Sequence, residues 1–171
     1  MNIGCYVTAV SYERRRLLTR TDVASIILAQ VEFYRSKYSF RFCGYVIMPD
    51  HWHFVFIADE SEVSPILRDV KSMVARLVID GWKADPACHR LLDQIRLPEI
   101  GKRNHQYSIW QEGNWKVLVD ELDAIERRLD YMHANPLRAG LVTRPEQWTW
   151  SSYRWYQFRE PVGVTIVAAE D

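Results

Sequence analysis

The stretch that decides the fold is GYVIMPDHWHFVFIADE, which runs from Gly44 to Glu60. Its β-branched and aromatic residues predict two strands, and the Met-Pro-Asp triplet at 48–50 predicts a tight break between them. The two strands therefore form a hairpin, and the second strand runs from His51 to Ile57.

Side chains alternate between the two faces of a strand. One face of the second strand is aromatic, which suits a buried core, and consists of Trp52, Phe54 and Phe56. The opposite face carries His51, His53, Val55 and Ile57. Two imidazoles one repeat apart have Cα atoms roughly 7 Å apart and can converge on one metal ion. On spacing alone, such a pair is more often a half-exposed strand end that binds nothing. Asp50 either orients a histidine or serves the turn.

The residues on either side of the hairpin predict the other elements. A strand at 6–11 and a helix at 21–37 precede it, and a helix capped by Ser64, with Pro65 as its first residue, follows it. Residues 83–106 predict a surface loop with one helical turn at 90–95. A strand at 107–119 then bends at Gly113–Asn114, and Asp120 caps a last helix.

This order predicts an α+β fold with a ferredoxin-like antiparallel sheet, β-α-β-β-α-β. The helices cover one face of the sheet, and the additional C-terminal helix carries Tyr131. We expect the other face, which holds the histidines, to be open to a ligand. Residues 1–171 form one domain with a C-terminal tail at 145–171.

Composition limits the classes of protein. The chain of 171 residues is 48% hydrophobic, so it is globular, and it has no apolar run of the length that a membrane span needs. The N-terminus lacks a secretion signal pattern, which predicts a cytosolic protein. The net charge of zero argues against bulk electrostatic binding of nucleic acid. Arginines nevertheless outnumber lysines by 17 to 5, which suits phosphate contacts but also follows from a GC-rich genome.

Several basic residues are candidates for contacts with phosphate. Arg14, Arg15 and Arg16 form either a solvated loop or a phosphate-binding edge. Arg68 and Lys71 lie outside the apolar stripe of their helix, on a face that either follows a nucleic-acid backbone or is simply solvated. The further candidates near the C-terminus are Arg128, Arg138, Arg144 and Arg154.

The last helix carries a second, separate stripe of Arg128, Tyr131 and Asn135. Asn135 precedes Pro136, so it is also suited to end the helix and cap the next turn. Tyr131 by itself is compatible with a packing role, and His133 is more consistent with a structural one. The aromatic residues of WTWSSY at 148–153 either stack on unpaired bases or fasten the tail to the body of the protein.

Three motifs in fixed order, MPDHWHFVF, LDYMHANPLRAGLV and WTWSSYRWY, resemble those of the REP-associated tyrosine transposases. This family belongs to the HUH superfamily of single-tyrosine transposases, named for its His-hydrophobic-His motif. The resemblance extends from Tyr6 to about Tyr156.

The resemblance implies a metal-dependent transposase and endonuclease that nicks and rejoins single-stranded hairpin DNA. Tyr131 would be the nucleophile that holds the 5′ phosphate, and His51, His53 and the amide oxygen of Asn135 would bind Mg²⁺ or Mn²⁺. The implied partners are hairpins like those of repetitive extragenic palindromes, bound by a monomer or a homodimer. Two other interpretations remain, namely a protein that binds hairpin DNA without cutting it and a ferredoxin-like RNA-binding module.

Overall fold

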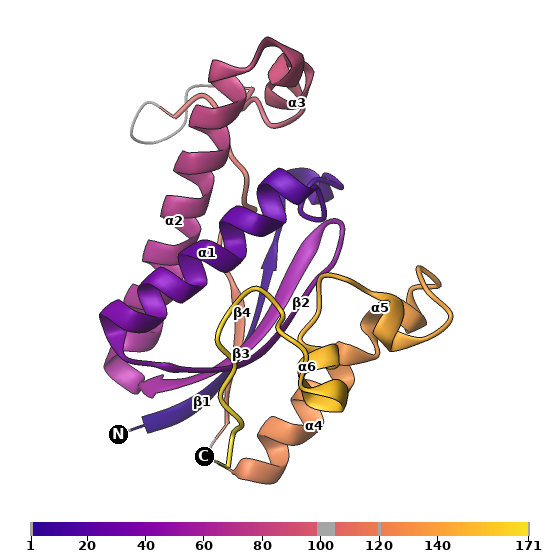
Figure 1. Cartoon of the computed structure of the whole chain (residues 1–171). Coiled ribbons are helices and arrows are strands. Elements are labelled where there is room, and N and C mark those ends of the chain that lie inside the picture. The colour runs from indigo at the N-terminus through magenta and orange to yellow at the C-terminus, as the bar shows by residue number, and fades with distance from the viewer. Residues whose placement is uncertain (1, 99–104, 120, 171) are drawn as a thin grey trace.

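The structure is a computed structural model, and it describes residues 2–98, 105–119 and 121–170. Figure 1 shows the strands, the helices and the long C-terminal segment. The strands are β1 (Asn2–Val10), β2 (Arg41–Ile47), β3 (His51–Asp59) and β4 (Trp115–Val119). The α-helices are α1 (Thr21–Tyr38), α2 (Glu60–Ala84), α3 (His89–Gln94), α4 (Leu122–His133), α5 (Asn135–Arg138) and α6 (Tyr153–Phe158). The short 3₁₀ helices are η1 (Tyr12–Arg14), η2 (Pro86–Cys88) and η3 (Pro145–Gln147).

The four strands form one antiparallel sheet in the order β2-β3-β1-β4. The chain enters them as β1-α1-β2-β3-α2-β4, which is the split β-α-β arrangement. The predicted ferredoxin-like sheet with an additional C-terminal helix is therefore confirmed. The hairpin of β2 and β3 turns at 48–50, where the Met48 amide donates to the His51 carbonyl oxygen at 2.8 Å.

The sheet has an apolar core on each face. Trp52, Phe54 and Phe56 pack with α1 and α2 in the larger core, as the alternation predicts. On the opposite face, Val55 and Ile57 pack in a smaller core against helix α4. Figure 1 shows α1 and α2 together on one side, whereas α4 lies apart from them.

The expectation of an open histidine face is therefore wrong over much of the sheet. The apolar side chains on that face need to be removed from water, and α4 provides a matching apolar stripe of Ile125, Leu129 and Met132. The histidines lie at the end of β3 where this cover stops, so the site lies beside a helix.

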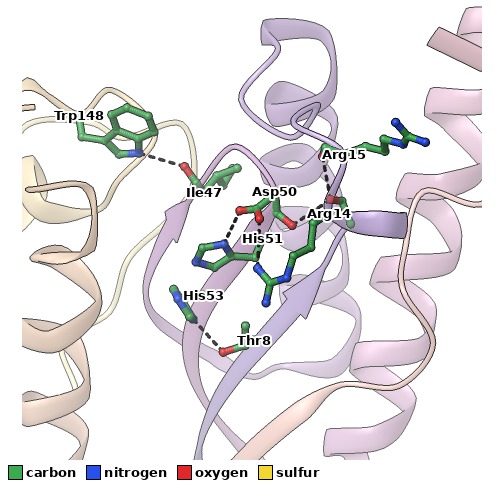
Figure 2. A network of polar contacts seen from close by, with 9 residues as sticks. Thr8, Arg14, Arg15, Ile47, Asp50, His51, His53 and Trp148 are labelled. Carbon is green, nitrogen blue, oxygen red and sulfur yellow. Dashed lines mark hydrogen bonds and ion pairs between the residues drawn. The ribbon is translucent and has the colours of Figure 1, made fainter. Parts of the chain in front are cut away.

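The C-terminal segment covers the outer edge of β2. The Ile47 amide donates to the Trp150 carbonyl oxygen at 2.9 Å, and the Ser152 amide donates to the Tyr45 carbonyl oxygen at 3.0 Å. The indole of Trp148 donates to the Ile47 carbonyl oxygen at 2.9 Å (Figure 2). Of the two interpretations of WTWSSY, the structure supports the one in which it fastens the tail, and it thereby protects a strand edge.

Two helix starts differ from the predictions. Helix α2 begins at Glu60, and the Asp59 carboxylate accepts from the Ser61 amide at 3.0 Å, so Ser64 is not its cap. Glu60 and Glu62 in the first turn favour this earlier start because they complement the helix dipole. Helix α5 begins at Asn135 after Ala134, so Asn135 is not a cap either. The predicted cap Asp120 lies outside the described residues.

The region between α2 and α4 is also organised differently from the prediction. The predicted strand at 107–119 is reduced to β4, because Gly113 adopts φ +77° and bends the chain just before it. Within the predicted loop, the helical turn is α3 and a single bridge joins Arg96 to Tyr107, while residues 99–104 lie outside the described residues. Of the helices that the structure describes, none combines the length and the apolar character needed to cross a membrane.

Gly44 allows α4 to approach the sheet closely. A Cβ atom at this position would lie 2.6 Å from Leu129 Cδ2 and 2.8 Å from Ser152 Oγ. We expect Gly44→Ala to lower the free energy of unfolding by about 1–3 kcal/mol, because the helix has to move away from β2. The matched control is Gly81→Ala in α2, where a Cβ meets no atom within 4 Å. Urea unfolding should show that the control gains up to about 1 kcal/mol, and equal stabilities of the two variants would contradict this account of the packing.

Candidate metal and DNA site at the end of β3

His51 and His53 lie at the start of β3 on the face that α4 partly covers. Their ring centroids are 4.7 Å apart with the planes at 78°, so the two imidazoles converge as their spacing predicts. Figure 2 shows the two rings next to each other, with Asp50 beside His51 and Thr8 beside His53. His53 is buried, with 8% of its surface exposed, and His51 is part-buried.

Asp50 holds the ring of His51. Its Oδ1 lies 2.7 Å from His51 Nδ1, and its Oδ2 accepts from the Arg14 guanidinium at 3.1 Å (Figure 2). The Ser11 amide and hydroxyl both donate to the Asp50 carbonyl oxygen at 2.9 Å, which fixes the turn. Burial raises the pKa of Asp50, but hydrogen bonds with His51 and Arg14 outweigh it and lower that pKa below its ordinary value. Asp50 thus serves both the turn and the histidine.

Strand β1 holds the ring of His53. The Tyr6 and Thr8 hydroxyl oxygens lie 2.9 Å and 2.8 Å from His53 Nδ1, and the Tyr6 ring stacks on the imidazole at 5.5 Å. Burial, with the nearby His51 as a second cause, lowers the pKa of His53 to about 3. His53 is therefore neutral near pH 7, which is the form of histidine that binds metal ions.

These contacts leave the same atom of each ring available. Both Nδ1 atoms have partners, whereas no hydrogen bond within the described residues reaches either Nε2. A histidine that binds metal usually has its other ring nitrogen held by a carboxylate or another polar group. The two rings therefore fit a metal ion.

The third ligand is less well defined. Among the described residues, no cluster of three or more His, Cys, Asp or Glu side chains is present, so a metal ion here would require a ligand of another type. Asn135 is half-buried at the first position of α5, and its side chain makes no hydrogen bond within the part of the chain that the structure describes. The structure does not join Asn135 to the histidines, and its role as a ligand stays a prediction.

Tyr131 lies in the last turns of α4 and is 49% exposed, so it is not a packing tyrosine. The Arg138 guanidinium lies 4.6 Å from the centroid of its ring and donates to its carbonyl oxygen at 3.4 Å. Burial raises the pKa of Tyr6 to about 12. Arg128, one helical turn before Tyr131, lies over the Tyr6 ring, so α4 places Tyr131 on the side of Tyr6, the residue that holds His53.

The candidate arginines separate into two groups. Five are paired with a carboxylate, namely Arg14 with Asp50, Arg15 with Glu13, Arg68 with Asp69, Arg144 with Glu146 and Arg154 with Glu160. In contrast, Arg128 and Arg138 form no ion pair within residues 2–98, 105–119 and 121–170, and their guanidinium groups lie over aromatic rings instead. Arg14 thus lies beside the Asp50 that holds His51, Arg128 lies over the Tyr6 that holds His53, and Arg138 lies over Tyr131.

Other candidates lie away from this group. The Lys71 ammonium donates to Gly113 O at 3.0 Å and to Asn114 Oδ1 at 2.7 Å, and burial lowers its pKa to about 8. Lys71 and Arg68 are on α2, which packs against the opposite face of the sheet. Arg16 is exposed, and Arg154 also donates to the Glu146 carbonyl oxygen within the tail. Lys71 and Arg154 thus have structural contacts of their own.

The sequence interpretation missed Tyr6 and Thr8 as partners of a histidine. It treated residues 6–11 only as a strand, although two hydroxyl side chains at alternate positions mark one face of β1 as polar. It also left Asp50 undecided. Strand register decides these contacts, since Thr8 pairs with His53 and Val10 pairs with His51.

Comparisons with known proteins support the resemblance found in the motifs. The chain is 23% identical over 150 residues to a Haemophilus influenzae protein assigned as a REP-associated tyrosine transposase, which covers 88% of this chain and 80% of that protein. The solved structure of a REP-associated tyrosine transposase bound to a REP hairpin superposes with a TM-score of 0.64 at 18% identity, over 98% of this chain and 90% of that one. A Deinococcus radiodurans protein assigned as a transposase gives a TM-score of 0.47 at 14% identity, over 77% of this chain and 92% of that one. No model of a protein family matches the chain.

His133 has a structural role, as the sequence indicates. Its Nε2 lies 2.8 Å from Ser152 Oγ, and burial lowers its pKa to about 4 from an ordinary value of 6.5. The unfolded chain therefore binds a proton at this residue at a higher pH than the folded chain does, so acid favours unfolding. Because of this residue, we expect the free energy of unfolding to be about 2 kcal/mol lower at pH 5 than at pH 8. Urea unfolding at the two pH values should show a smaller reduction in His133→Gln, and identical reductions would contradict this assignment.

Proposed function

We propose that this chain is a REP-associated tyrosine transposase that nicks and rejoins single-stranded hairpin DNA through Tyr131. The observation that carries the proposal is a pair of imidazoles together with a half-exposed tyrosine beside an arginine. Among the described residues, neither Nε2 atom has a hydrogen-bond partner and the arginine has no ion pair. The relative that is bound to a REP hairpin supports the same class of DNA substrate. We also propose a cytoplasmic location for this activity.

In this proposal, Mg²⁺ or Mn²⁺ would be held by His51, His53 and the amide oxygen of Asn135. The ion would polarise the scissile phosphate and stabilise the leaving 3′ oxygen. Imidazole and amide oxygen ligands suit these ions, which keep open positions for water and substrate. Asp50, Tyr6 and Thr8 would keep the two rings oriented, since each holds an Nδ1 atom.

The reaction at Tyr131 is a transfer of one phosphoester bond to another. The phenol oxygen forms a bond to phosphorus, and the bond from phosphorus to the 3′ oxygen breaks. The phenol loses a proton and the released 3′ oxygen gains one, which gives a 3′ hydroxyl. The product is a 5′-phosphotyrosine with its ester bond conserved, so rejoining needs no nucleotide cofactor. A free phenol is a weak nucleophile, and the Arg138 guanidinium, which lies over the Tyr131 ring, would bind the phosphate that the phenol oxygen attacks.

Arg128 and Arg138 are the residues that we propose for binding the phosphates that flank the reaction. Neither charge is neutralised by a carboxylate within the described residues, and both lie on the Tyr131 side of α4 and α5. An arginine without an acidic partner attracts phosphate more strongly than one already paired. Arg14 would act mainly through Asp50.

The alternative of an RNA-binding module is disfavoured by the position of α4. Such modules stack bases on aromatic residues of an exposed sheet face. Here one face is covered by α1 and α2, and the other is covered in large part by α4. A protein that binds hairpins without cutting them would have no need for two convergent imidazoles with available Nε2 atoms.

The nucleophile can be tested directly with a labelled hairpin and its single-stranded flanks, taken from repeats beside the gene. With Mn²⁺ or Mg²⁺, we expect part of the label to migrate with the protein on a denaturing gel. Tyr131→Phe should abolish this band, since it removes the only atom that forms the bond. The matched control, Tyr107→Phe, changes a half-exposed tyrosine far from the site and should keep the band. A covalent band that persists in Tyr131→Phe would falsify the proposed nucleophile.

The role of Asp50 can be tested by metal affinity. Asp50→Asn keeps the shape of the side chain but removes the charge that holds His51 Nδ1, so we expect Mn²⁺ to bind about 10- to 100-fold more weakly. Isothermal titration calorimetry would measure the change. Asp80→Asn, which alters an exposed aspartate on α2 paired with Arg76, is the control and should bind Mn²⁺ as the parent does. Equal affinities in the two variants would show that Asp50 serves only the turn.

A further inference from the structure

Trp115 lies in the same row of the sheet as the buried histidine. Thr8 of β1 pairs with His53 on one side and with Trp115 on the other, and directly paired residues point to the same face. Neighbouring strands are about 4.8 Å apart, so the Cα atoms of Trp115 and His53 are separated by roughly 10 Å. An aromatic side chain therefore stands two strands from the histidine pair, on the sheet's outer strand β4.

This indole is not part of the core. Trp115 is 55% exposed, whereas Trp52 and Trp82 are buried. Its ring meets Tyr6 edge-on, at 5.7 Å and 84°, which leaves much of the indole facing solvent. Single exposed hydrophobic side chains are common on protein surfaces, so the exposure of Trp115 gains meaning only from the groups beside it.

The charge beside Trp115 indicates what it binds. The Arg128 guanidinium lies 6.0 Å from the Trp115 ring and 5.3 Å from the Tyr6 ring, with no ion pair among the described residues. Arg128 and Tyr131 are three residues apart on α4, so their side chains are neighbours on one side of that helix. Exposed indole, unpaired arginine and exposed tyrosine thus follow one another along a single path.

We propose that Trp115 stacks on an unpaired base of the DNA strand held at Tyr131, while Arg128 binds the phosphate between the two. This inference rests on the proposed function for the identity of the strand, and it adds a base-binding subsite to it. A combination of an aromatic platform and a nearby arginine is how proteins bind single strands with little sequence preference. A protein partner at the β4 edge is the competing occupant, and it would not require the arginine.

The test measures binding without cleavage, in the Tyr131→Phe background and in EDTA. The probe is the labelled hairpin with its single-stranded flanks, together with a series in which one unpaired base at a time is replaced by an abasic site. We expect Trp115→Ala to weaken binding of the intact probe about 5- to 100-fold, the range for loss of one base–aromatic stack. Trp115→Phe should retain most of the affinity. Phe33→Ala, which removes an equally exposed aromatic residue from α1, is the matched control and should bind as the parent does.

The abasic series identifies the stack. One abasic position should weaken binding to the parent but have no further effect on Trp115→Ala, because both changes remove the same contact. Additive losses at every position, or equal affinity of Trp115→Ala and the parent, would overturn the proposal. A change in oligomeric state with unchanged DNA binding would also overturn it and favour the protein partner.

The outcomes separate this inference from the function on which it rests. If Tyr131 forms the covalent band but Trp115→Ala binds like the parent, only the base-binding subsite is wrong. If the abasic coupling is found and no covalent band forms, the subsite stands and the proposed cleavage is wrong. If the parent binds none of the hairpins, both are overturned.

Discussion

The alternation of side chains along β3 is the constraint on which the rest of the structure depends. The strand serves two cores, because Trp52 and Phe56 pack on one side and Val55 and Ile57 pack on the other. The histidines occupy the positions where the second core ends. A shift of β3 by one residue would exchange its two faces and place both imidazoles in the larger core. The register that builds the cores therefore also sets the site.

The polar groups of the site satisfy a second constraint, since buried imidazoles need partners. Each ring is held from a different element, His51 by the turn at Asp50 and His53 by the hydroxyls of β1. In both cases the bond is to Nδ1, so no hydrogen bond among the described residues occupies either Nε2 atom. Arg14, in the segment after β1, donates a hydrogen bond to the Asp50 carboxylate. Ser11, in the same segment, donates to the Asp50 carbonyl oxygen. The orientation of the rings thus depends on contacts far apart in the sequence.

Local pattern was sufficient to predict the order of the elements, the two faces of β3 and the pairing of His51 with His53. It was insufficient where distant segments decide the outcome. Helix α4 covers the sheet because it approaches the sheet closely at Gly44. The bend at Gly113 is predicted from the sequence, but the limitation of β4 to Trp115–Val119 is not. Lys71 looked like a surface charge on its helix, but it holds that bend across 42 residues of chain. Tyr6 and Thr8 were invisible as site residues because only strand register brings them to His53.

Net charge is a poor guide to what this protein binds, because the pairing of each charge matters more than the sum. The chain is neutral as a whole, with 22 basic and 22 acidic residues. Most of the candidate arginines are neutralised locally by a carboxylate, as Arg68 is by Asp69. The arginines beside Tyr131 are different, since Arg128 and Arg138 lie over aromatic rings and face no acid among the described residues. In a neutral protein, these two arginines beside Tyr131 attract a phosphate to that place, without the long-range attraction to every nucleic acid that a basic protein has.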